Sequence, residues 1–149
     1  MRFTEFCELV NDLKKKHPIW FELSSKYLPN DTDLYNIEQY YNVTLPDDYK
    51  SFLKNYGGGY FGFSQVFSFD TTDKLYIMCN NSIEFVKENK FISIADLGTG
   101  DLVGYKIQNK VCSNELYFWN HESKNLEKSH YKNFLDFILK EGLKINLNS

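Results

Sequence analysis

The fold is decided by residues 44–69, which read TLPDDYKSFLKNYGGGYFGFSQVFSF. The first half of this stretch repeats apolar residues at the spacing of one helix face, at Leu45, Tyr49, Phe52, Leu53 and Tyr56. Thr44 stands before Leu-Pro-Asp-Asp, a capping-box-like start whose acids favour the positive end of a helix. The glycines at 57–59 permit the left-handed backbone that ends helices. The pattern therefore predicts a helix over 45–56.

After the glycines the period of the pattern changes from that of a helix to that of a strand. Phe61, Phe63, Phe67 and Phe69 alternate with smaller or more polar residues, which predicts one half-buried strand over 61–69. Further strands are predicted over 75–79, 91–95, 102–107 and 116–119, with a short edge strand over 143–147.

Helical spacing recurs on both sides of these strands. It predicts helices over 3–17, where Pro18 ends the pattern, over 31–42, over 82–89 with Ser82 as cap, and over 131–141 with Ser129 as cap. Helices first, strands in the middle and a helix at the end predict an α+β fold. We expect one domain, 1–149, with a twisted, mostly antiparallel or mixed sheet of about five to six strands flanked by N-terminal helices and a C-terminal helix.

Composition narrows the class of protein. The 149 residues carry a net charge of −3, and no stretch approaches the ~20 apolar residues of a membrane span. The start of the chain lacks the pattern of a signal peptide, so we expect a cytoplasmic protein. Cys7, Cys79 and Cys112 are odd in number and far apart, which argues against disulfides or a zinc ribbon. Aromatic residues make up 17% of the chain, more than one small core hides, which favours an aromatic recognition surface.

Three short motifs resemble the SUKH superfamily, which is named partly after yeast cell-wall assembly regulators. They are Leu45-Pro46-Asp47-Asp48-Tyr49 with its glycine stop, Gly98-Thr99-Gly100-Asp101, and Tyr117-Phe118-Trp119-Asn120-His121-Glu122. The resemblance covers roughly residues 34–139 and implies a twisted sheet flanked by helices. It also implies a bacterial immunity protein, which binds and blocks a cognate polymorphic toxin, often a nuclease, without catalysing a reaction.

Other motifs favour structural roles. The run Gly57–Gly62 satisfies G-x-G-x-x-G, but a helix precedes it and a strand follows, the reverse of a dinucleotide site. Gly98–Asp101 fits a hairpin turn better than an anion cradle, and the acids Asp96 and Asp101 beside it suit a turn. His121, Glu122 and His130 lack the spacing of a zinc site.

The function predicted from sequence is stoichiometric inhibition of a cognate protein toxin by covering its active site. We expect the partner-binding residues on a concave sheet face and nearby loops, at Tyr60, Asp70, Asp73, Asp96, Asp101, Tyr105 and Glu122. No catalytic residue, cofactor, metal, nucleic-acid contact or membrane contact is expected, and the oligomeric state, a monomer or a weak dimer, is left open. Two alternatives also stay open, a regulatory or scaffold binding domain like the cell-wall assembly regulators and a small hydrolase or nucleotide-processing enzyme.

Overall fold

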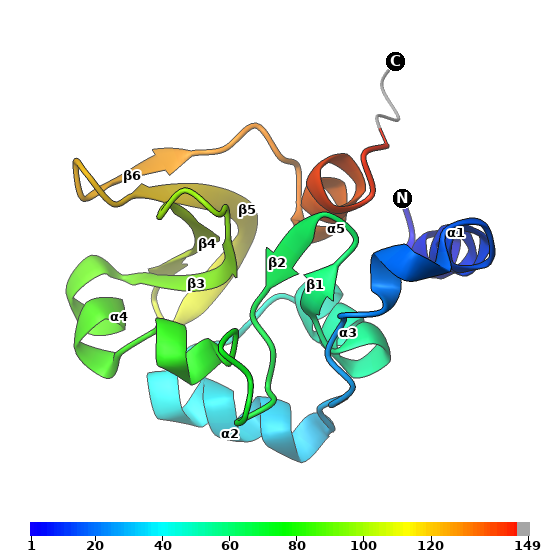
Figure 1. The fold of residues 1–149 in the computed structure, drawn as a ribbon. Coiled ribbons are helices and arrows are strands. Elements are labelled where there is room, and N and C mark those ends of the chain that lie inside the picture. Colours follow the sequence, from blue (N-terminus) through cyan, green and yellow to red (C-terminus); the bar gives the residue numbers. More distant parts are fainter. Residues whose placement is uncertain (146–149) are drawn as a thin grey trace.

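The fold is a curved antiparallel sheet with helices on both sides, seen in a computed structural model that describes residues 1–145 (Figure 1). The strands lie in the sheet in chain order, and they are β1 (Gly59–Phe61), β2 (Ser64–Val66), β3 (Phe91–Asp96), β4 (Leu102–Gln108), β5 (Val111–Asn120) and β6 (Asn125–Lys128). Every neighbouring pair is antiparallel. This confirms the predicted α+β class.

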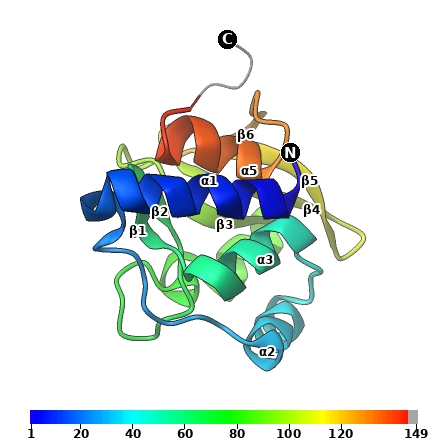
Figure 2. The same cartoon turned by 90° about the vertical axis from the view of Figure 1, so that its right-hand side faces the viewer.

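The helices flank the sheet as predicted, at both ends of the chain. They are α1 (Phe3–Lys16), α2 (Asp31–Tyr41), α3 (Asp47–Tyr56), α4 (Ile83–Asn89) and α5 (Phe134–Phe137), with short helical turns η1 (Pro18–Phe21), η2 (Ile77–Asn80) and η3 (Ile138–Gly142). Figures 1 and 2 show α1, α3 and α5 on one side of the sheet and α4 on the other. No helix within residues 1–145 has the length and apolar character needed to cross a membrane.

Helix α3 begins directly after Pro46 and ends at the first glycine of the Gly-Gly-Gly run. Gly57 has a φ of 76°, in the left-handed region that side chains other than glycine rarely adopt. A Cβ at Gly57 would also lie 2.7 Å from the backbone oxygen of Tyr27. The glycine therefore ends the helix and lets the chain pass close to the segment before α2.

The single strand predicted over 61–69 is wrong, because this stretch reverses direction. β1 and β2 form a hairpin in which Phe61 faces Ser64, and Gly62 turns the chain with a φ of 59°. Phe63 lies in the turn with 57% of its surface exposed, and its ring centroid is 5.1 Å from that of Trp20. The alternation of phenylalanines indicated a half-buried segment but carried no signal for the reversal.

The strand predicted over 75–79 is also wrong, since these residues form a loop and the helical turn η2. One isolated bridge joins Ser68 to Tyr76. The loop is held to β3 by Asn81, whose side chain accepts a hydrogen bond from the Ser93 amide at 2.8 Å and donates one to the Ser93 carbonyl at 2.9 Å. Leu75 and Ile77 are therefore buried although they lie in a loop and a helical turn rather than in a strand.

The last predicted helix is shorter than expected and starts later. Asn133, not Ser129, accepts the capping hydrogen bond, from the Asp136 amide at 2.9 Å. Four residues of α5 then widen into the π turn η3. The edge strand predicted over 143–147 does not form at Leu143–Ile145, and the rest of that prediction lies outside the described residues. β6 was not predicted, because Asn-Leu-Glu-Lys offers no apolar alternation.

One face of the sheet builds the core with α1, α3 and α5. Its central row consists of paired residues from four neighbouring strands, Val66, Ala95, Val103 and Phe118, which we call the core row. The first three of these residues have no exposed surface. Below them Phe52 of α3 lies with its ring 4.9 Å from Phe61 and 5.0 Å from Phe134, in edge-to-face contacts typical of aromatic cores.

Candidate functional site

The opposite face of the sheet carries a row of side chains that all retain exposure. One residue from each strand pairs directly with the next, and the row reads Tyr60, Gln65, Asp96, Leu102, Trp119 and Leu126. Directly paired residues project to the same face of a sheet, so these six side chains form one continuous line, which we call the open row. None of the six is buried, and Tyr60 is 47% exposed.

Trp119 is the largest side chain of the open row, and it packs against two further aromatic rings. Its ring stacks at 6.4 Å from Phe91 of β3 and meets Phe85 of α4 edge-on at 5.1 Å. These two contacts fix the indole while part of it stays exposed. Figure 1 shows β3 to β6 curving around the side on which α4 lies, so Trp119 stands on the concave side of the sheet.

A second row on the same face is mostly buried, at Ser93 and Gly104. Gly104 pairs with Ser93 on one side and with Tyr117 on the other. A Cβ at Gly104 would collide with the Ile92 carbonyl, so the backbone of β3 passes so close to Gly104 that only glycine fits there. Beside it the Lys106 ammonium lies 5.6 Å from the centre of the Tyr117 ring, a cation–π contact.

The two turns at one end of the open row are joined by an acid–histidine pair. The Asp101 carboxylate accepts hydrogen bonds from the His121 backbone amide at 3.0 Å and from His121 Nδ1 at 2.6 Å. These bonds, the backbone one first, lower the pKa of Asp101 below its usual range, so it stays charged in mild acid. Glu122 lies 4.0 Å from His121 Nε2 on the outer side. This end of the face therefore carries negative charge, and hydrogen bonds between Asp101 and His121 join its two turns.

The structure divides the residues that the sequence predicted for partner binding. Tyr60 and Asp96 lie in the open row, and Asp101 and Glu122 lie in the turns at its end. Tyr105 does not reach this surface. It follows Gly104 on β4 and therefore points to the core side, where it has no exposed surface and packs 6.0 Å from Tyr49. Tyr105 was predicted to contact the partner, and the structure corrects this, because its buried side chain is not accessible on this surface.

Asp70 and Asp73 lie in the loop that follows β2, away from the acid–histidine pair. Asp70 accepts hydrogen bonds from the Thr72 amide at 3.0 Å and the Thr72 hydroxyl at 2.7 Å, and these lower the pKa of Asp70. Asp73 accepts from the Leu75 amide at 3.0 Å. Both carboxylates stabilise the loop beside a pocket that is formed with α2.

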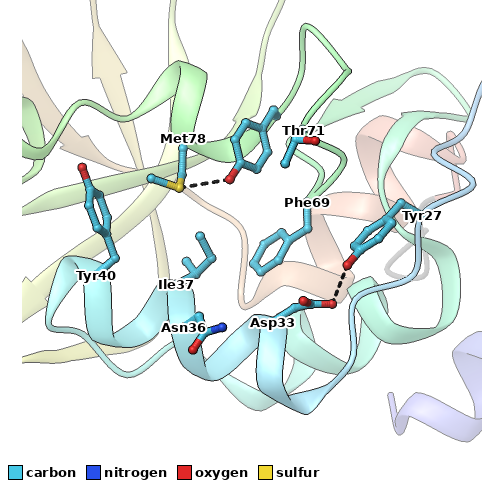
Figure 3. Close-up of a pocket in the computed structure, with 9 residues that line it drawn as sticks. Tyr27, Asp33, Asn36, Ile37, Tyr40, Phe69, Thr71 and Met78 are labelled. Atoms are coloured by element: carbon cyan, nitrogen blue, oxygen red, sulfur yellow. Dashed lines mark hydrogen bonds between the residues drawn. The ribbon is translucent and has the colours of Figure 1, made fainter.

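That pocket, which we call the α2 pocket, has a volume of about 340 Å³ (Figure 3). It is lined by Tyr27, Asp33, Asn36, Ile37, Tyr40, Phe69, Thr71, Tyr76 and Met78. The sequence did not single out these residues, because they come from a connector, a helix and a loop that are distant in the chain. The richness in tyrosine was the one signal that pointed to such a surface.

The open row was likewise only partly visible in the sequence. Leu102, Gly104 and Lys106 alternate with the buried Val103 and Tyr105, and this period of two assigns them to the other face. Which residues of neighbouring strands stand beside them depends on register, which the sequence does not state.

Within residues 1–145 no three His, Cys, Asp or Glu side chains gather in a way that could hold a metal ion. The cysteines are free thiols, and burial raises the pKa of Cys112 to about 12, so this thiol is protonated and a poor nucleophile at neutral pH. What the described geometry offers is a surface, with an aromatic centre and an acidic end.

Comparison with protein families gives one match. The family model described as "SMI1-KNR4 cell-wall" (SUKH_6) matches residues 31–138, a span that runs from the start of α2 into η3 and includes the whole sheet. No curated protein and no solved structure matches the chain. Since the family model covers well over half of the sequence and contains every strand of the open row, the chain belongs to the SUKH superfamily.

Proposed function

We propose that this chain is an immunity protein, which binds a cognate protein toxin through the open row and covers the toxin's active site. Its superfamily includes toxin immunity proteins, and this membership supports the class of function. The proposed action is binding without turnover. A nuclease-type toxin is the partner class that we favour, because its substrate is an anion and its surface is correspondingly basic.

The observation that carries this proposal is the continuous open row. Six paired residues cross the whole sheet with none of them buried. At about 4.8 Å between strands, five intervals give a line about 24 Å long, which is the scale of a protein interface that buries about 800 Å² on each partner. A face of this size on a rigid sheet suits a protein partner.

The chemistry of the face supports the same partner. Trp119 and Tyr60 are the residue types that most often anchor interfaces, and Trp119 is fixed in place by two further rings. Asp96, Asp101 and Glu122 place negative charge at the turns around the row. Such charges at a rim accelerate the encounter with a basic surface more than they increase the final affinity.

The test is growth rescue by co-expression with the cognate toxin, which we expect to be encoded in a reading frame next to that of this chain. The wild-type chain should restore growth, and a variant with Tyr60→Ser, Leu102→Lys and Leu126→Lys should not. A matched variant with Tyr35→Ser, Ile19→Lys and Leu28→Lys changes three exposed apolar residues outside the open row and should rescue as well as wild type. Failure of the wild-type chain to bind or neutralise the toxin would reject the proposal, while equal rescue by both variants would reject the open row as its site.

A second candidate function is a regulatory binding domain, and the description of the matching family model favours it. Such a domain would use the same face to join proteins of a cell-wall assembly pathway. It would bind its partner without restoring growth against a toxin, so the rescue experiment separates the two functions.

A further inference from the structure

The α2 pocket has the shape and size of a site for one side chain or a small organic molecule. Its volume of about 340 Å³ is at the lower end of the range for ligand pockets. The buried side chains of Ile37 and Phe69 line its interior, and the exposed Tyr27 and Tyr40 line its mouth. Figure 3 shows these two tyrosines at opposite ends of the cavity, with Phe69 between them.

Aromatic rings dominate the walls of the α2 pocket. Tyr27, Tyr40, Phe69 and Tyr76 are four of the nine lining residues, and the thioether of Met78 adds a polarisable group. The Tyr76 hydroxyl donates to Met78 Sδ at 3.1 Å, which holds these two side chains together. The face of an aromatic ring is negative and attracts cations, and cages of several aromatic rings recognise ammonium groups in this way.

Asp33 is the one charged residue among those that line the pocket. Its Oδ2 atom accepts hydrogen bonds from the Tyr27 hydroxyl at 2.7 Å and from the Asn30 amide at 3.0 Å. Its Oδ1 atom has no hydrogen-bond partner among residues 1–145. The bond to Asp33 raises the pKa of Tyr27, so Tyr27 remains a neutral donor and holds the carboxylate in position at the mouth.

These features select the charge of the occupant. An anion would be repelled by Asp33, and a neutral apolar group would cover the carboxylate without replacing its hydration. A cation with an apolar stem would contact the rings along its length and pair with Oδ1 at its head. We propose that the α2 pocket binds a basic side chain, lysine or arginine, of a partner protein.

This site goes beyond the proposed function, because it lies on α2 and the loop over 69–78, outside the open row. The loop that carries Asp70 and Asp73, two residues that the sequence analysis assigned to partner binding, forms part of the pocket wall. The inference concerns the pocket and its cation, and it stands or falls without any measurement on a toxin.

Methionine methyl resonances offer a direct test, since the chain has two methionines, one in the pocket and one at the N-terminus. The full chain with ¹³C-methyl methionine would be titrated with Nα-acetyl-lysine amide and with Nα-acetyl-arginine amide. At least one of them should shift the Met78 signal in a saturable way while the Met1 signal stays in place. Nα-acetyl-norleucine amide, which has the same stem without the charge, should bind at least about tenfold more weakly.

Paired variants provide the controls. Asp33→Asn should weaken cation binding about tenfold, whereas Asp31→Asn, in the same turn of α2 but outside the pocket lining, should leave it unchanged. Tyr40→Leu should weaken it, and Tyr35→Leu, another exposed tyrosine of α2, should not. The proposal is overturned if neither cation shifts Met78, if the norleucine amide binds as well as the cations, or if the paired variants behave alike.

Discussion

The two faces of the sheet differ in burial from β1 to β4, although their residues are neighbours in the chain. Val103 of the core row has no exposed surface, and Leu102 beside it in the open row retains exposure. The same holds for Ala95 and Asp96 on β3. Helices α1, α3 and α5 cover one face, whereas the other, on which α4 packs, keeps a line of aromatic, apolar and acidic groups that remain partly exposed. One face therefore builds the core, and the other retains the exposed groups on which the proposed recognition depends.

The largest loss of stability should result from shortening a buried side chain on the core face. Leu116 is fully buried on β5, so Leu116→Ala should lower the free energy of unfolding by about 2–5 kcal/mol. The same change at Leu102, in the open row, should cost only about 1 kcal/mol. Urea unfolding of both variants measures the difference. Equal losses would show that the two faces do not differ in the way described.

A side chain added at Gly104 should be the most damaging change on the open face. Its Cβ would meet the Ile92 carbonyl and would lie 2.7 Å from Ser93 Cα, so the backbone of β3 must move. We expect Gly104→Ala to lower the free energy of unfolding by about 1–3 kcal/mol. Lys106→Ala, two residues along the same face of β4, is the control and should change it by less than about 1 kcal/mol. Thermal unfolding that ranks the two variants in the other order would contradict the close approach of the β3 backbone to Gly104.

The hydroxyl of Tyr105 offers a test with the opposite sign. Tyr49 and Tyr105 are fully buried, and neither hydroxyl has a hydrogen-bond partner among residues 1–145. Tyr105→Phe should therefore leave the free energy of unfolding unchanged or raise it by about 1 kcal/mol. Tyr41→Phe is the matched control, because the Tyr41 hydroxyl donates to the Asn81 carbonyl at 2.6 Å, and its loss should cost about 1 kcal/mol. A clear loss of stability in Tyr105→Phe would show that its hydroxyl is satisfied.

The smallest effect concerns the acidic end of the open face, and it depends on pH. Hydrogen bonds from His121 lower the pKa of Asp101 in the folded state. Its contribution to stability is therefore present above the ordinary carboxyl pKa and is lost as the pH falls through the lowered pKa.

Asp101→Asn should accordingly lower the urea midpoint at neutral pH, and the gap to wild type should close below about pH 4. Asp12→Asn changes an exposed acid of α1 and serves as the control. A gap between Asp101→Asn and wild type that stays constant down to pH 2 would show that the carboxylate charge does not stabilise this turn.

Features that depend on residues close together in the chain could be predicted from the sequence, and features that depend on contacts between distant segments could not. Local signals were sufficient for the existence of α3 and β3, where the helical spacing, the glycine stop and the apolar run agree. The cap predicted at Thr44 was wrong, because the helix begins after Pro46 and no side chain caps it. Local signals also failed at Gly62, because a turn inside an apolar stretch looks like part of a strand, and at β6, because its residues are mostly polar. Tyr105 was predicted on the partner-binding face but lies on the core face. Which residues of β4 point to which face depends on the phase of its alternation, and Gly104 has no side chain that would indicate this phase.

The candidate site follows the same rule. Asp96 and Tyr60 were predicted as surface residues, but their alignment with Leu102, Trp119 and Leu126 depends on the register of five strand pairs. The α2 pocket depends on a loop over 69–78, and part of this loop, 75–78, was predicted as a strand. In both cases the missing information is a contact between segments that are distant in the chain.

The central claim is that the open row is where a protein partner binds, and Trp119 can report on it directly. Trp20→Phe leaves Trp119 as the one tryptophan of the chain. Titrating this variant with the toxin that the wild-type chain neutralises in the rescue experiment should produce a saturable blue shift of Trp119 emission, because the partner removes water from the indole. Binding or neutralisation of the toxin with the Trp119 spectrum unchanged would contradict the claim.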